Sequence, residues 1–391
     1  MPWKEVKPMD EKVLFLADYL RESQTFTDLC CNYGISRKTG YKWVLRYIEE
    51  GVEGLHNRST APKRQPNKTP YYIHKAIIQL RRKKKIRLGP SKIQTMLLEE
   101  YCEDEIPSHT TIYNILRREG LVTSRKIRKR VPPMPQPFEP VKNPNDVWTA
   151  DYKGQFLTKD GKWCYPLTVM DHQSRYLLGC RGHEKISTEA AKKSFEQIFR
   201  RYGLPSRIRT DNGVPFASHS LGGISHLSKW WIRLGILPER IKPGKPQQNG
   251  VHERMHRTLK DSAINPPGHN LKHQQRLFDG FMQEYNEERP HDALQKKKPS
   301  SCYHKSSREF PKKLPELEYQ GHYRVVPVSN GGLMYCFGNI IYTGHVLTGE
   351  RVGMEEVQDG VWKVYFGPIY LGCFDQRGIM NNKYGYCSLK V

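Results

Sequence analysis

Apolar residues recur at helical spacing through the amino-terminal third of the chain. The spacing predicts helices at residues 10–22, 26–33 and 36–49, with Gly34 supplying a turn and Ser36 an N-cap. This order is typical of a helix-turn-helix module, which we assign to residues 1–58. In its third helix one face is cationic, as a recognition helix requires, and another is apolar and predicted to pack inward. The cationic positions are Arg37, Lys38, Lys42 and Arg46, and the apolar positions are Tyr41, Val44, Leu45 and Ile48. A plain three-helix bundle with a solvated basic face is the alternative.

A second module of the same kind is predicted at residues 69–122, after a Pro-rich linker at residues 59–68. Helical spacing recurs over three stretches, residues 70–84, 90–100 and 108–119. His109 and Thr110 begin the last of these helices, which we expect to read DNA.

Two basic stretches border this second module. The first is a cluster that we expect to contact DNA phosphates, with a solvated surface as the alternative. It consists of Arg81, Arg82, Lys83, Lys84 and Lys85. The second is a linker at residues 123–140, where prolines and like charges favour an extended chain. We expect Arg128 and Arg130 of this linker to lie along DNA.

From residue 141 onward the pattern alternates between strand and helix spacing. Strands are predicted at residues 147–152, 163–170, 176–181 and 206–211, and the first three are expected to form an antiparallel meander. A helix capped by Ser187 or Thr188 and closed by Gly203 crosses over before the fourth strand. We assign this α/β domain to residues 141–305.

Beyond residue 320 the pattern changes to short strands that are broken by glycines. Residues 320–391 therefore predict a small β-barrel. A barrel of this kind binds DNA or a second subunit, or serves only as a cap, and the sequence favours none of these roles.

Three acidic residues stand where strands end or a helix begins. Asp151 and Asp211 end two of the predicted strands, and Glu253 opens a predicted helix. Acids at the open edge of a sheet suit Mg²⁺, and two such ions stabilise both the attacking and the leaving oxygen of a phosphodiester displacement. Taken singly, each acid reads as a cap or a turn residue. Asp171 is a fourth acid, and its place in a turn predicts a structural role instead.

Four motifs give the chain a resemblance to the integrase-core DDE transposases of bacterial insertion sequences, which are relatives of retroviral integrase. They are residues 148–151 (Trp-Thr-Ala-Asp), 210–213 (Thr-Asp-Asn-Gly), 248–254 (Gln-Asn-Gly-Val-His-Glu-Arg) and 285–291 (Tyr-Asn-Glu-Glu-Arg-Pro-His). The resemblance implies a ribonuclease H-like core in which Asp151, Asp211 and Glu253 hold two Mg²⁺ or Mn²⁺ ions. It also implies recognition of terminal inverted repeats by a dimer or a larger assembly on DNA. The stretch between Asp211 and Glu253 is longer than in retroviral integrases.

The helix that begins near Glu253 carries His256, Arg257 and Lys260 on its successive turns. These residues are predicted to share one face with Glu253 and to contact DNA phosphates beside the metal ions. The motif at residues 285–291 is read as structural, with contact of Arg289 and His291 to DNA as the alternative.

Composition indicates a polyanionic partner. The formal net charge is +24 at pH 7, which is far from the balance of an ordinary soluble enzyme. The sequence has no apolar run long enough to span a membrane and no pattern of a secretory signal. The nine cysteines include no C-x-x-C pair, which favours reduced thiols and a cytoplasmic, nucleoid-associated protein.

Together these features predict a multidomain enzyme that cuts double-stranded DNA at the ends of its own element and joins them to target DNA. The fold class is two all-α helix-turn-helix modules, an α/β catalytic core and a small carboxy-terminal β-barrel. Two alternatives stay open: a non-catalytic DNA-binding regulator derived from such an enzyme, and a nuclease that lacks strand transfer.

Overall fold

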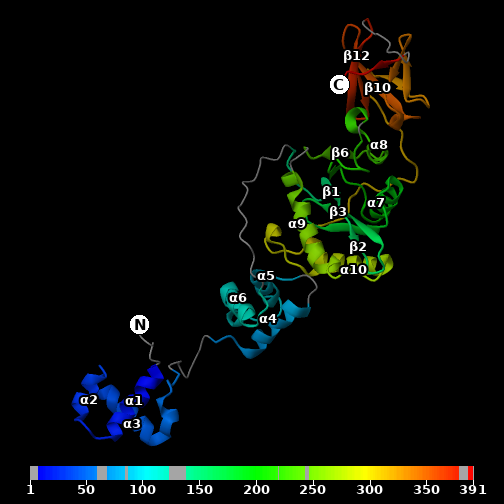
Figure 1. Cartoon of the computed structure of the whole chain (residues 1–391). Helices are drawn as coiled ribbons and strands as arrows, with labels where there is room; N and C mark the ends of the chain where they lie inside the picture. The colour runs from blue at the N-terminus through cyan, green and yellow to red at the C-terminus, as the bar shows by residue number, and fades with distance from the viewer. Residues whose placement is uncertain are drawn as a thin grey trace. The chain divides into compact units, whose positions relative to one another are not determined.

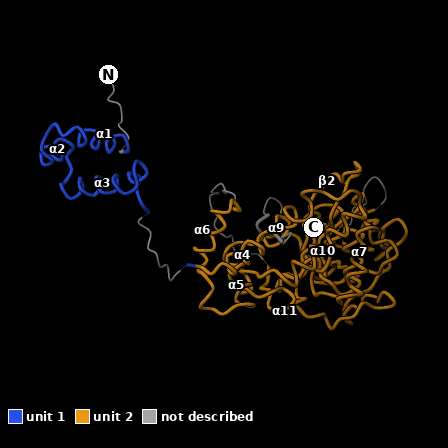
Figure 2. Tube along the Cα trace, turned by 90° about the horizontal axis from the view of Figure 1, so that it is seen from below, with its two compact units in different colours: residues 1–68 blue, residues 69–391 orange. Residues whose placement is uncertain are grey.

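The structure is a computed structural model that describes residues 8–59, 68–83, 87–122, 138–218, 220–242, 246–377 and 386–390. The chain divides into two compact units, residues 1–68 and residues 69–391 (Figure 2). Four of the predicted DNA contacts, Lys84, Lys85, Arg128 and Arg130, lie outside the described residues, as does the side chain of Lys83.

The first unit is a three-helix module. Its helices are α1 (Pro8–Leu20), α2 (Phe26–Asn32) and α3 (Arg37–Glu50), followed by the 3-10 turn η1 (Gly51–Leu55). Ser36 caps α3 by accepting a hydrogen bond from the backbone of Thr39 at 3.2 Å, which satisfies one of the free N–H groups of the first turn. The predicted helices and their cap are confirmed.

The inner face of α3 differs from the prediction. The helix buries Gly40, Trp43 and Val44. Three residues that were predicted to pack inward are instead 53, 57 and 69% exposed, namely Tyr41, Leu45 and Ile48. The buried face is set by Trp43, which shares a core with Leu55 of η1 because the chain folds back after α3. Of the apolar set, only Val44 follows the prediction.

The second helical module belongs to the second unit. Its helices are α4 (Tyr71–Lys83), α5 (Pro90–Leu97) and α6 (His109–Arg118), with the 3-10 turn η2 (Glu103–Glu105) between the last two. Ser108 caps α6 through the backbone N–H of Thr111. Fully buried isoleucines from all three helices, such as Ile73, Ile93 and Ile112, form the core, so these helices also agree with the prediction.

A six-stranded mixed sheet forms the centre of the next domain. The strands lie in the order β2-β3-β1-β5-β6, with β4 paired to β3. Their bounds are β1 Val147–Tyr152, β2 Phe156–Leu157, β3 Trp163–Asp171, β4 Leu177–His183, β5 Arg207–Thr210 and β6 Leu237–Arg240. The pairs β1–β3 and β3–β4 are antiparallel, which confirms the predicted meander, and β1, β5 and β6 run parallel to one another.

Helices cover both faces of this sheet (Figure 1). On one face lie α7 (Thr188–Tyr202), capped by Ser187 as predicted, and α8 (His226–Arg233), preceded by the turn η3 (Leu221–Gly223). The other face holds α9 (Gly250–Leu259), which follows η4 (Pro246–Asn249), and α10 (Leu271–Gln283). Single π-turns extend these two helices as η5 (Lys260–Ile264) and η6 (Glu284–Glu288), before η7 (Asp292–Leu294) and α11 (Pro299–Cys302). This is the order of a ribonuclease H-like core.

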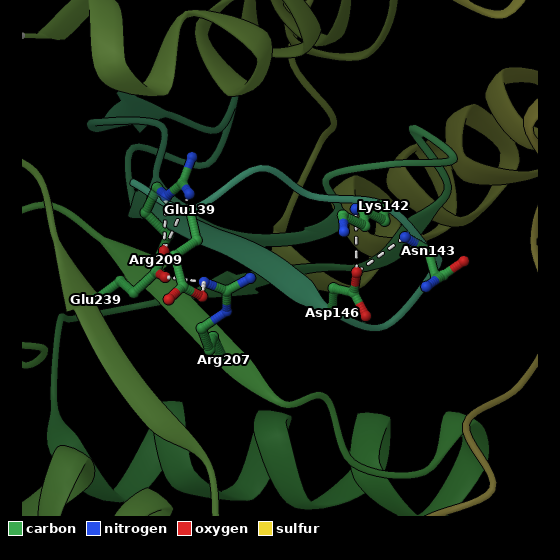
Figure 3. A network of polar contacts seen from close by, with 7 residues as sticks. All are labelled: Glu139, Lys142, Asn143, Asp146, Arg207, Arg209 and Glu239. Carbon is green, nitrogen blue, oxygen red and sulfur yellow. Dashed lines mark hydrogen bonds and ion pairs between the residues drawn. The ribbon is translucent and has the colours of Figure 1, made fainter. Parts of the chain in front are cut away.

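Charged residues join β5 to β6 at the edge of the sheet (Figure 3). Arg207 and Arg209 both point to the Glu239 carboxylate, with N–O distances of 3.0 Å. Arg207 also pairs with Glu139 at 3.2 Å, and the Arg209 guanidinium lies 4.0 Å from the centroid of the Phe138 ring. Residues just ahead of the core are thereby tied to β5, next to the edge strand β6.

The carboxy-terminal region consists of two sheets around one core. The larger has the order β12-β11-β10-β7 and the smaller the order β13-β9-β8. Their strands are β7 Arg324–Pro327, β8 Leu333–Cys336, β9 Asn339–Tyr342, β10 Arg351–Gln358, β11 Val361–Phe366, β12 Ile369–Asp375 and β13 Cys387–Ser388, with the turn η8 (His345–Leu347) after β9. Ladder pairing among the described strands leaves the two sheets separate, so the predicted small β-barrel is not confirmed. The shared core includes Ile224 and Ile232 from the neighbourhood of α8.

No helix in the described part of the chain combines the length and the apolar character needed to cross a bilayer.

Candidate metal centre

The alternation of side chains along β1 decides what faces α9. Trp148 and Ala150 point into the core under α7, where they pack with Phe195 and Phe199. Because successive side chains of a strand point to opposite faces, Thr149 and Asp151 lie on the α9 side. Asp151 is one residue from the end of β1 and is partly buried.

Asp211 lies level with Asp151 on the neighbouring strand. The parallel ladder pairs Val147 with Arg207 and Thr149 with Arg209, and the same register continued by two residues brings Asp151 opposite Asp211. Adjacent strands are about 4.8 Å apart. Asp211 follows directly after β5, and its Oδ1 accepts the backbone N–H of Gly213 at 3.1 Å.

Glu253 is exposed in the first turn of α9, and its neighbour His252 fixes that helix to the sheet. His252 has no solvent-exposed surface. Its Nδ1 lies 2.8 Å from the hydroxyl of Thr149 on β1, and its Nε2 lies 2.7 Å from the hydroxyl of Thr168 on β3. A side chain that bridges two strands in this way sets the position of α9 over the sheet, and with it the position of Glu253.

The hydroxyl of Thr168 is the centre of a small polar network. It donates to the backbone carbonyl of Asp151 at 3.0 Å, and it also lies 2.7 Å from Nε2 of His256 as well as from His252. A hydroxyl has one hydrogen and two lone pairs, so both histidines donate from Nε2 when the carbonyl receives the hydrogen. This arrangement leaves Nδ1 of His256 facing the Asp151 carboxylate at 3.7 Å.

The acidic residues lie in a region that favours a bound cation. Burial and the negative charge of Asp211, with a smaller effect of Glu253, raise the pKa of Asp151 to about 7, although a hydrogen bond from the Tyr152 backbone and the charge of Lys153 act to lower it. Burial lowers the pKa of His252 to about 3 and also lowers that of His256, so both imidazoles are neutral. Among the described residues, none of the three acids pairs with a lysine or an arginine. Carboxylates that act on one another electrostatically and have no cationic partner, in a strongly basic chain, fit a divalent metal ion.

A second set of possible metal ligands overlaps this site. Asp151, His252 and His256 present ligand atoms that lie within 4.8 Å of one another. The threonine hydroxyls already occupy both nitrogens of His252 and the Nε2 of His256. Only the Nδ1 of His256 remains beside Asp151, so the histidines suit a positioning role better than direct coordination.

The predicted DNA contacts fall into two groups in the structure. Most lie at exposed or partly exposed positions, namely Arg37, Lys38, Lys42, Arg46, Arg82, His109, Thr110, Arg257 and Lys260. Arg81 and His256 do not fit the prediction. The guanidinium of Arg81 donates to the backbone carbonyls of Leu88 and Leu121, which holds the second module together. His256 lies about 60° around α9 from Glu253, at the border of the buried face, and its ring is inside the protein.

Sequence reasoning missed the network around His252, although its members stand beside two of the acids in sequence. It did assign a structural role to Asp171 and to the motif at residues 285–291, and contacts in both places agree with that role. Asp171 accepts hydrogen bonds from the backbone of Asn145 and from Ser174. Asn286, in the motif at residues 285–291, bonds both the N–H and the carbonyl of Leu177 at 2.8 and 2.9 Å.

Models of known protein families match most of the chain between residues 12 and 299. A model described as an integrase core domain matches residues 141–246, and another of the same description matches residues 234–299. A helix-turn-helix domain model matches residues 12–63, and a homeodomain-like domain model matches residues 39–116.

Individual relatives come from mobile elements and retroviruses. An uncharacterized 31.7 kDa protein of insertion element IS407 from Burkholderia multivorans is 29% identical over 215 residues, which are 54% of this chain and 75% of that protein. A 39.2 kDa protein of insertion element IS476 from Xanthomonas euvesicatoria is 26% identical over 60% of this chain and 62% of its own length. The Gag-Pol polyprotein of baboon endogenous virus is 34% identical over 119 residues, only 6% of that polyprotein.

Solved structures with some likeness are retroviral. The catalytic core domain of HTLV-2 integrase in complex with magnesium, in its dimeric form, is 17% identical, with 41% of this chain and 98% of that chain covered and a TM-score of 0.32. A simian T-cell lymphotropic virus intasome in complex with a PP2A regulatory subunit is 17% identical, with coverage of 71% and 93% and a TM-score of 0.34.

Proposed function

This chain belongs to the integrase-core transposases of insertion elements, and from that premise we propose that it cuts DNA at the ends of its own element and joins the resulting 3′-hydroxyl ends to target DNA. The attacking group is water or a DNA 3′-hydroxyl, so no side chain acts as a nucleophile. The protein contributes position and charge stabilisation.

We assign the metal ligands to Asp151, Asp211 and Glu253. Two Mg²⁺ or Mn²⁺ ions held there would activate the attacking oxygen and stabilise the leaving one. Asp151 and Asp211 come from adjacent parallel strands, and Glu253 comes from the helix that His252 ties across those strands. The observation that supports this proposal is the register of β1 and β5, which places Asp151 and Asp211 at matching positions on adjacent strands, together with the charges of Asp211 and Glu253, which both act on the Asp151 carboxyl.

The remaining parts of the chain bind and arrange the DNA in this proposal. The two modules, residues 1–58 and 69–122, would recognise terminal repeats through α3 and α6. The linker at residues 59–68 joins the two modules, and the linker at residues 123–140 joins the second module to the core. Arg257 and Lys260 on α9 would hold phosphates beside the scissile bond. The core would be residues 141–305. Joining two ends calls for at least a dimer on DNA, within the bacterial cytoplasm and its nucleoid.

The region at residues 320–391 packs on the core beside α8, where it would bind DNA or a second subunit or serve only as a cap. Lys229 and Arg233 of α8 each lie 3.6 Å from the Glu350 carboxylate. A closed barrel is not required for this role.

The test is a strand-transfer assay with a pre-cut element end and a target plasmid. Asp151→Asn, Asp211→Asn and Glu253→Gln should each abolish cutting and joining in Mg²⁺ and leave end binding nearly intact. Mn²⁺ should replace Mg²⁺, whereas Ca²⁺ should support binding but little chemistry, because its longer and looser coordination positions the oxygens badly. Asp261→Asn is the control, since it removes an exposed acid just beyond α9.

The outcomes separate the candidate functions. Joining above a few per cent of wild type in one of the three variants would remove that residue from the centre. Binding of ends without cutting by the wild-type protein would indicate a regulator. Cutting without joining would indicate a nuclease.

A further inference from the structure

A cavity of about 290 Å³ lies on a second flank of α9. Its wall on this helix is formed by Val251, Arg254 and Thr258, among others. An α-helix turns by about 100° per residue, so these positions point away from His252 and His256, which face the acids. The cavity is therefore distinct from the candidate metal centre, although one helix borders both.

The cavity is rich in cations. Arg175, Arg254 and Arg289 of the core line it together with Lys92 of α5. Its only lining acid among the described residues is Asp292, which already forms an ion pair with Lys296. Burial lowers the pKa of Arg175 and of Arg289, and burial together with the charge of Arg289 lowers the pKa of Lys92 to about 8. Like charges held close together in a partly buried space favour an anion between them.

Two buried donor or acceptor atoms at the cavity have no hydrogen-bond partner among the described residues. They are Nη1 of Arg289 and Nε2 of His291. Buried polar groups are nearly always hydrogen-bonded, and an unpaired group in a native structure points to a missing partner. A group with several oxygen acceptors would satisfy the arginine and also balance the surrounding charge.

The fourth cation, Lys92, belongs to α5. This helix and a residue shortly after it contact the segment beyond the motif at residues 285–291. Nζ of Lys296 lies 2.7 Å from the hydroxyl of Ser91, and Nζ of Lys298 lies 2.9 Å from Glu99. Lys92 stands next to Ser91 on the same helix. The cavity is thus completed by the second helical module resting against the core.

We propose that this cavity binds one phosphate group. A phosphate offers several charged oxygens to arginine forks and to the lysine ammonium, which is the geometry that Arg and Lys recognise best. We expect DNA to supply this phosphate, either from its backbone or from a 5′ end, and only this expectation rests on the proposed function.

The first experiment uses inorganic phosphate and thermal unfolding of the full-length protein. At equal ionic strength, phosphate should raise the unfolding midpoint of the wild type by a few degrees over chloride, because it binds only the folded state. The double variant Lys92→Gln with Arg254→Gln should lose this rise. Arg254 is exposed and Lys92 is partly buried, and neither belongs to a hydrophobic core, so the fold should persist. The matched control removes two exposed cations elsewhere, Lys193→Gln with Lys272→Gln, and should keep the rise. Equal rises in both double variants would overturn the proposal.

The second experiment identifies the source of the phosphate. If it is a DNA end, a 5′-phosphorylated duplex should bind the wild type about tenfold more tightly than a 5′-hydroxyl duplex, and the cavity variant should lose the difference. If it is the backbone, the two duplexes should bind alike, and the cavity variant should weaken both about tenfold beyond the control variant. Unchanged binding of both duplexes would refute DNA as the source. The Asp151→Asn protein should retain the phosphate-dependent midpoint, so failure of the strand-transfer proposal would leave this test unaffected.

Discussion

Replacing His252 with phenylalanine keeps a ring in the core but removes the two hydrogen bonds that His252 makes from α9 to the sheet, and leaves the one from His256 to Thr168. Each threonine hydroxyl retains another partner, because Thr149 lies 3.2 Å from the carbonyl of Met170 and Thr168 lies 3.0 Å from the carbonyl of Asp151. We therefore expect the free energy of unfolding to fall by about 1–3 kcal/mol at neutral pH. A larger loss would be expected only if the bulkier phenylalanine ring strained the packing around it.

The same substitution should cost less in acid. Burial lowers the pKa of His252 to about 3 from an ordinary value of 6.5. Between these two pH values His252 is protonated in the unfolded chain and neutral in the folded chain, which favours unfolding. The stabilisation that His252 provides is therefore complete above pH 6.5 and is lost as the pH falls. At pH 5 the loss is about 2 kcal/mol, since each pH unit is worth about 1.36 kcal/mol. Phenylalanine cannot titrate, so the stabilities of the two proteins should converge toward pH 5.

The measurement is chemical denaturation of the full-length protein in a chelating buffer. Tryptophan fluorescence reports on the core because Trp148 and Trp231 are fully buried there. His226→Phe is the matched control, since His226 is exposed on α8, and it should change stability by no more than about 0.5 kcal/mol. Equal stability of His252→Phe and wild type at pH 7.5, or a difference that grows in acid, would refute the reasoning.

Three further outcomes are expected. Arg257→Ala combined with Lys260→Ala should reduce strand transfer strongly and end affinity only modestly, because misplacement by about 1 Å can cost roughly a hundredfold in rate; near-normal joining would place the DNA on another face. Lys42→Ala should lower the preference for terminal-repeat over random duplex by about 1–3 kcal/mol if Lys42 contacts base edges, and an equal weakening on both duplexes would make it a phosphate contact. Asn286→Leu should destabilise the core by about 2 kcal/mol in thermal unfolding, since both polar groups of Leu177 lose their partner; an unchanged midpoint would contradict that role.

Local patterns in the sequence predicted the elements well. A helix cap depends only on residues within one turn of it. Each of Ser36, Ser108 and Ser187 caps the helix that it was expected to begin. The strands ending near Asp151 and Asp211 could also be predicted, because alternation and a following turn are local signals. The inner face of α3 could not, since it depends on η1 folding back over Trp43.

The contacts that organise the candidate centre are non-local, and the sequence alone does not reveal them. His252 is separated from Thr149 and Thr168 by 103 and 84 positions, so nothing in its own neighbourhood marks it as a bridge. In the sequence, His252 resembles any residue on the buried face of an amphipathic helix. Its partners become evident only when the sheet that packs against the helix is known. The same is true of Arg81, whose charge predicted a surface and whose contacts lie inside the module.

The orientation of α9 links the candidate metal centre to the phosphate cavity. Glu253 and Arg254 are consecutive, so the acid near the metal centre and a cation of the cavity move together when the helix rotates. His252 limits that rotation. We therefore expect His252→Phe to weaken metal-dependent joining and the phosphate-dependent rise in unfolding midpoint together, whereas Asp151→Asn should affect only the first. Loss of joining in the His252 variant with a full phosphate response would show that the two flanks of α9 are positioned independently.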